Sequence, residues 1–122
     1  LKIVIVENEV GWIPFMLQQW DYYYNRFKGR NPMPITMRPS EYFDRQGYAT
    51  FFKDAVAGQS FNFWGQDNCM WSNDFPHENT TWPNSVDVIN DTLGHLPPDV
   101  LSKLLYKNAE RLYGIEIPGN TP

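Results

Sequence analysis

The sequence predicts an α/β fold built on a small parallel sheet. Its first residues form a nearly continuous β-branched run, Leu1–Val6, of the kind found in strands that helices cover on both faces of a parallel sheet. Apolar residues then recur at steps of three and four between Trp12 and Phe27, which is the period of an amphipathic helix. Strand and helix patterns keep alternating along the remaining sequence, and this alternation is typical of right-handed βαβ units.

The first strand and its helix are the clearest of these patterns. The strand is expected at Ile3–Val6 and ends abruptly in a polar stretch that starts at Glu7. The helix over Trp12–Phe27 carries Pro14 in its first turn, where the missing amide hydrogen is not needed for helix bonding. Gly29 follows at the position where a helix commonly ends.

The middle of the chain predicts a helical turn, a strand, a short helix and a further strand. The turn begins near Ser40, whose hydroxyl is expected to cap it. Tyr48–Phe52 is rich in aromatic and β-branched residues and predicts the second strand. A short helix over 56–64 leads to the third strand, Cys69–Ser72, which continues to Asp74 before Phe75 and Pro76 stop it.

Two amphipathic helices complete the pattern, at Ser85–Leu93 and at Pro98–Tyr113, the second ending at Gly114. We expect one domain over residues 1–122. Three strands cannot close an eight-stranded barrel, which needs about 250 residues. The chain is therefore expected to be a piece of a larger barrel.

Composition excludes several classes of function. The formal net charge is −4, and no run of basic residues offers the electrostatic footprint of a nucleic-acid-binding protein. No apolar run approaches the roughly 20 residues of a membrane span, so no membrane partner is expected. Cys69 is the only cysteine, which rules out an intrachain disulfide and favours a cytoplasmic location.

Three separated motifs carry a resemblance to a known family. They are WSNDFPH at Trp71–His77, WPNS at Trp82–Ser85 and NAERLYGI at Asn108–Ile115. In this order they are similar to the C-terminal signature of the amidohydrolase-2 family of metal-dependent hydrolases and decarboxylases, which includes ACMSD-like enzymes. The resemblance implies a partial (β/α)8 TIM barrel, in which the predicted strands correspond approximately to strands 6 to 8 with their helices.

The same resemblance implies that Asp74 is a metal ligand and general base. In the family, the aspartate that closes the eighth strand lies beside a divalent metal, and Asp74 matches that position. A metal lowers the pKa of the water that it binds, and a nearby carboxylate can accept the released proton. Strand alternation directs Met70 and Ser72 to the same face as Asp74. The alternative is that Asp74 only caps the following turn.

Glu7 is the candidate for a second metal ligand. It lies at the end of the predicted sixth strand, where the resembling family commonly carries a histidine. A glutamate can ligate a hard or borderline cation, so the change would alter the charge of the site and the metal it prefers. Zinc is the favoured metal, with manganese or iron as alternatives. The other interpretation of Glu7 is a carboxylate paired with a neighbouring Arg or Lys.

His77, Trp12 and Trp82 are the candidates for contacts with a small-molecule substrate. His77 follows the aspartate in a loop and either lines the pocket or makes a local hydrogen bond. Trp12 and Trp82 fall above predicted strand ends, where they are placed to wall a pocket. Trp20 and Trp64 are expected to pack between helix and sheet, as aromatic residues at helical spacing usually do.

Two functions remain open on the sequence. The first is a segment of a hydrolase or decarboxylase acting on a small cyclic or aromatic carboxylate, inactive alone because the family's histidines on the first and fifth strands would precede Leu1. Its unpaired strand edges predict a homo-oligomer or association with the missing barrel half. The second is a non-catalytic, truncated binding or interaction module that has lost the metal site.

Overall fold

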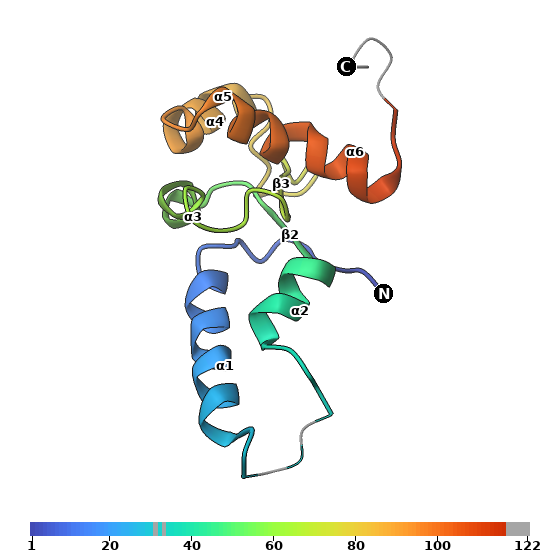
Figure 1. Ribbon diagram of the computed structural model, residues 1–122. Helices are drawn as coiled ribbons and strands as arrows, with labels where there is room; N and C mark the ends of the chain where they lie inside the picture. Colours follow the sequence, from blue (N-terminus) through green and yellow to red (C-terminus); the bar gives the residue numbers. More distant parts are fainter. Residues whose placement is uncertain (31, 33, 117–122) are drawn as a thin grey trace.

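The computed structural model describes residues 1–30, 32 and 34–116, and it contains a three-stranded parallel sheet packed with helices (Figure 1). The strands pair in the order β1-β2-β3. The elements along the chain are β1 (Ile3–Ile5), α1 (Ile13–Phe27), α2 (Pro39–Gln46), β2 (Gly47–Phe51), α3 (Ala55–Ser60), β3 (Cys69–Trp71), α4 (Ser85–Leu93), α5 (Pro98–Ser102), a π-helical segment (Lys103–Lys107) and α6 (Asn108–Tyr113).

The strands are staggered in the sheet: β2 and β3 end level with each other, because Phe51 is the partner of Trp71, whereas β1 ends two residues earlier. Ile5 is the partner of Ala49 in β2, and Ala49 is in turn the partner of Cys69 in β3. Because all three strands run parallel, the loops that follow them leave from one edge of the sheet. In Figure 1, α1 and α2 lie side by side at the bottom of the view and α4 to α6 at the top. The predicted α/β class and its parallel sheet are confirmed.

The core lies on the helix-facing side of the sheet. Ala49, Phe51 and Cys69 are buried there, and the Phe51 ring packs on Phe61 with ring centroids 5.0 Å apart. Burial raises the pKa of the Cys69 thiol, because charging it would place a thiolate in apolar surroundings. Cys69 is thus a packing residue. Helices contribute the other buried apolar side chains, among them Ile13, Leu17, Ala57, Leu93, Val100 and Leu104.

The last helical region runs from Pro98 to Tyr113 as the sequence predicts, interrupted by the π-helical segment. Asn108 at the start of α6 is fully buried, and its side-chain amide donates to the carbonyl oxygens of Gln66, at 2.7 Å, and Cys69, at 2.8 Å. These bonds hold α6 against β3. The region ends at Gly114, whose φ of 64° is the left-handed conformation that glycine adopts readily.

Two local predictions are wrong. The Ser40 hydroxyl does not cap α2: it donates to Asp21 at 2.6 Å, while the Glu41 carboxylate accepts from the Arg38 amide at 2.8 Å. Trp20 does not pack between helix and sheet, because 44% of it is exposed beside the edge of β1. The prediction for Trp64 is confirmed, since it packs against the core.

Element boundaries also shift slightly. The helix predicted over 56–64 is α3, which ends at Ser60. The first and second strands each end one residue earlier than predicted, and the third ends at Trp71 instead of continuing to Asp74. Across the described part of the chain, no helix is long and apolar enough to cross a bilayer.

Candidate metal centre

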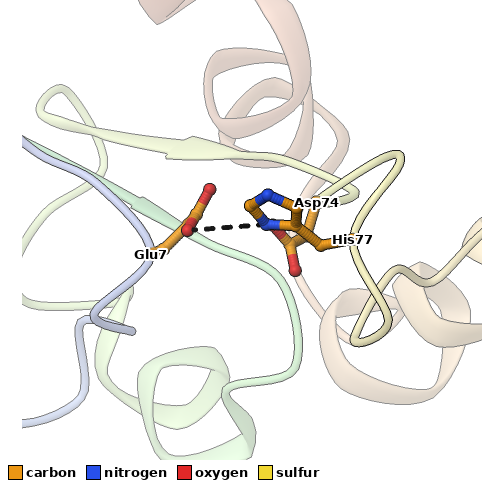
Figure 2. A group of neighbouring side chains, drawn as sticks. All are labelled: Glu7, Asp74 and His77. Atoms are coloured by element: carbon orange, nitrogen blue, oxygen red, sulfur yellow. Dashed lines mark hydrogen bonds and ion pairs between the residues drawn. The ribbon is translucent and has the colours of Figure 1, made fainter.

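Glu7 stands just beyond the end of β1, in a loop with unusual backbone geometry. Its φ is 60°, a left-handed backbone conformation that residues other than glycine, asparagine and aspartate seldom adopt. The Glu7 amide donates to the Thr50 hydroxyl oxygen of β2 at 3.1 Å, which anchors the loop to the neighbouring strand. The carboxylate projects across the C-terminal edge of the sheet toward the loop after β3 (Figure 2).

Asp74 and His77 lie in that loop after β3. Asp74 also has a positive φ, 56°, and its carbonyl accepts from the His77 amide at 2.9 Å, which closes a tight turn. Asn73 supports the turn from outside: its carbonyl accepts from the Thr81 amide at 3.0 Å and from the Thr80 hydroxyl at 2.7 Å. The turn therefore directs the side chains of Asp74 and His77 to the same side.

The three side chains meet at the edge of the sheet, as Figure 2 shows. His77 Nδ1 lies 3.0 Å from Asp74 Oδ1 and 4.0 Å from Glu7 Oε2. The Asp74 side chain is only 7% exposed, whereas that of Glu7 is 48% exposed and that of His77 is 67% exposed. The site thus has a buried carboxylate at its base and two solvent-facing groups above it.

This donor set fits a divalent cation. One ligand atom from each side chain lies within 4.8 Å of the other two. Nitrogen and oxygen ligands at about 2.1 Å from one tetrahedral ion lie about 3 to 3.5 Å from each other, so a small rotation of the exposed Glu7 side chain would bring all three into range. Two carboxylates and one imidazole also supply the negative charge that such an ion requires.

The alternative interpretation of Asp74, that it only caps the following turn, does not agree with the geometry. Within the described residues, no backbone amide donates to the Asp74 carboxylate, so it does not cap the turn that follows it. Its partner is the ring of His77. Similarly, no Arg or Lys among the described residues pairs with Glu7, whose carboxylate instead lies 4.0 Å from His77 Nδ1.

The centre opens into a hollow of about 570 Å³. Glu7, Asp74 and His77 share its wall with Phe52, Pro76, Glu78 and Asn79. Phe52 was not predicted as a site residue, although it is the last residue of the predicted second strand and so belongs to the same sheet edge. Its position at the end of a predicted strand was the sequence feature that could have identified it.

The two tryptophans predicted to contact substrate lie outside this hollow. The Trp12 indole N–H donates to the Asn8 carbonyl at 3.0 Å, and 42% of the residue is exposed. Trp82 is 61% exposed. His95, the other histidine of the chain, is placed away from the centre, with Nε2 at 3.0 Å from the Gly58 carbonyl oxygen.

Comparisons with known proteins agree with this architecture. A family model described as amidohydrolase matches residues 1–115. No curated protein matches the sequence. Among solved structures, the crystal structure of 5-carboxyvanillate decarboxylase LigW from Sphingomonas paucimobilis is similar, with a TM-score of 0.74 and 29% sequence identity. The match covers 95% of this chain and 34% of that one, so the chain spans about a third of the decarboxylase.

Proposed function

This chain belongs to the amidohydrolase family, and we propose that it forms the C-terminal part of a metal-dependent decarboxylase or hydrolase acting on a small aromatic or cyclic carboxylate. The observation that carries the proposal is the convergence of Glu7, Asp74 and His77 at the C-terminal edge of a parallel sheet. Active sites of α/β barrels lie at this edge. The similarity to a decarboxylase whose name specifies an aromatic carboxylate supports the substrate class.

Asp74 is proposed as both metal ligand and general base. Its carboxylate is buried at the base of the centre, where Oδ1 contacts His77 Nδ1 and Oδ2 has no hydrogen-bond partner among the described residues, so Oδ2 is available to bind an ion or take up a proton. A bound divalent ion would polarise a substrate oxygen and acidify water at the site. Burial strengthens the interaction of the Asp74 charge with any cation beside it.

Glu7 and His77 are proposed as the other two ligands, which would complete the three protein ligands usual for a catalytic zinc. Zinc is the metal we favour, and manganese or iron remain alternatives because two of the three donors are carboxylates. Trp12 and Trp82 remain proposed substrate contacts, each reached only by a substrate that extends beyond the hollow.

The proposed placement in the barrel makes residues 1–122 a single C-terminal segment, with β1, β2 and β3 as strands 6, 7 and 8. β1 and β3 are the two edges of the sheet. Beside β1 an apolar groove of about 410 Å³ is lined by Ile3, Ile5, Trp20 and Phe43, among others. Such an edge and groove support pairing with the remainder of a barrel or with another copy of the chain.

We expect the isolated chain to form a dimer or larger oligomer at micromolar concentration, measured by sedimentation velocity. Ile3→Lys should shift it toward monomer, because Ile3 is 52% exposed at the groove and a charge there opposes association. Val86→Lys, at a 67% exposed position on α4, is the matched control and should leave the distribution unchanged. A strictly monomeric wild-type chain would contradict this part of the proposal.

The metal site itself is tested by titrating the metal-free chain with Zn²⁺ and with Mn²⁺. One equivalent should bind, and His77→Ala should weaken binding by more than about 100-fold, since residues that only orient a ligand already contribute about 10- to 100-fold. His95→Ala removes the other histidine, which contacts Gly58 instead, and should bind like the wild type.

The titration also distinguishes the alternative function. The high exposure of Glu7 and His77 is the observation that favours a non-catalytic interaction module. Absence of binding by the wild-type chain, or equal loss in both histidine variants, would favour that module over the enzyme segment.

A further inference from the structure

Each of the loops that follow β1 and β2 places a carboxylate against backbone amides of the other loop. From the first loop, Glu9 Oε2 accepts from the Phe52 amide at 3.1 Å and Oε1 accepts from the Lys53 amide at 3.2 Å. From the second loop, Asp54 Oδ2 accepts from the Val10 amide at 2.7 Å and from the Gly11 amide at 2.6 Å. Each loop therefore binds the backbone of the other through one acidic side chain. We call this arrangement of Glu9 and Asp54 the carboxylate latch.

All the partners of the latch are backbone N–H donors, which suits an ionised carboxylate because it only accepts. The second oxygen of Asp54, Oδ1, accepts from the Ala57 amide at 2.8 Å and so caps α3. Asp54 is only 9% exposed. Gln at position 9 would turn an NH₂ group toward one of the two amides that Glu9 binds, so it cannot reproduce both bonds. Asn at position 54 could keep its oxygen toward Val10 and Gly11, so removing this half of the latch requires a side chain without an acceptor.

The space around the latch is equally restricted. A Cβ added at Gly11 would lie 2.9 Å from Asp54 Oδ1 and 2.9 Å from Val56 Cβ, closer than real Cβ atoms approach. The close approach of the first loop to Asp54 thus depends on glycine at this position. The two loops therefore meet both through the hydrogen bonds of the latch and through close packing of the Gly11 backbone against the Asp54 and Val56 side chains.

The latch acts on the segment that presents Glu7. Both Glu7 and Glu9 have left-handed φ values, 60° and 51°, and such conformations persist only where surrounding contacts hold them. Glu9 is two residues beyond Glu7, and Phe52, whose amide Glu9 binds, lines the hollow of the candidate metal centre. We propose that Glu9 and Asp54 are positioning residues that fix the Glu7 carboxylate opposite Asp74 and His77. The metal role of this inference rests on the proposed function.

Glu9 itself is not one of the proposed metal ligands. Both of its oxygens already accept from backbone amides, and its carboxylate is not part of the group formed by Glu7, Asp74 and His77. Its contribution is to the geometry of Glu7, which predicts an effect on metal affinity without direct contact with the ion.

The first arm of the test measures amide hydrogen exchange in the metal-free chain. Glu9→Gln should accelerate exchange at Glu7, Val10 and Gly11 by about tenfold or more, although the acceptor of the last two, Asp54, is unchanged. Asp54→Ala, which removes both acceptor oxygens, should likewise accelerate exchange at Phe52 and Lys53. Exchange that changes only at the amides whose own acceptor is replaced would overturn the latch.

The second arm measures Zn²⁺ and Mn²⁺ affinity of the same variants by titration. Each should bind about 10- to 100-fold more weakly than the wild type. Asn108→Ala is the control, because it removes buried hydrogen bonds that hold α6 to β3 and so lowers stability without touching the latch. Unchanged affinity in both latch variants, or an equal decrease in Asn108→Ala, would refute the positioning role.

The hydrogen-exchange arm tests the latch independently of metal binding. If the wild-type chain binds neither ion, the proposed function and the metal role of the latch fail together. Exchange at Glu7 then still decides whether the latch holds this segment.

Discussion

Asp74→Asn is expected to lower kcat by about 10²- to 10⁴-fold in the enzyme completed by the rest of the barrel. Asparagine keeps the shape of aspartate but neither carries its negative charge nor accepts a proton, so it removes both proposed roles of this residue. The fold should persist, because the only side-chain partner of Asp74 among the described residues is His77. The measurement is steady-state decarboxylation or hydrolysis of aromatic carboxylates, with far-ultraviolet circular dichroism to verify folding.

Asp91→Asn provides the matched control for this substitution. Asp91 is an exposed residue of α4, and the change in charge is the same as at position 74. The control should keep the activity of the parent enzyme. If Asp74→Asn also keeps it, Asp74 is neither the general base nor an essential ligand.

Phe61→Ala is expected to destabilise the chain by about 3 to 5 kcal/mol. Phe61 is fully buried and packs against Phe51 of β2, so truncation leaves a cavity between α3 and the sheet. Globular domains are stable by only about 5 to 15 kcal/mol, and a loss of this size would unfold a substantial fraction of the protein at moderate temperature. The free energy of unfolding is measured by urea denaturation at fixed protein concentration, because association also contributes to stability.

Phe63→Ala tests whether this loss comes from burial. Phe63 lies two residues further along the same turn but is 74% exposed, so its truncation should change the free energy of unfolding by less than about 0.5 kcal/mol. Equal destabilisation by the two substitutions would contradict the assignment of the core.

Periodicity was sufficient to predict most of the fold. The helix at Ser85–Leu93 has the predicted boundaries, and all three predicted strands are present, although the third ends at Trp71 instead of Asp74. Each of these elements buries an apolar face, and the spacing of apolar residues along the sequence indicates that face directly. Trp20 was misplaced because a helical stripe does not reveal that the neighbouring sheet ends at β1, which leaves the residue beside an open groove.

The candidate centre was only partly visible in the sequence. Glu7 and Asp74 follow predicted strands, and parallel strands bring their ends together, so their proximity follows from topology. The position of His77 depends on a turn that returns its ring to the Asp74 carboxylate. The latch was not predicted at all, because Glu9 and Asp54 bind amides 43 or 44 residues away and each alone resembles an ordinary loop acid.

The central claim is that Glu7, Asp74 and His77 bind one divalent ion at the edge of the sheet. Anomalous diffraction from crystals of the chain grown with zinc tests it most directly. The prediction is a single anomalous peak within about 2.0 to 2.2 Å of one ligand atom from each of the three side chains. An ion bound elsewhere on the chain, or density without the carboxylate of Asp74 among its ligands, would contradict it.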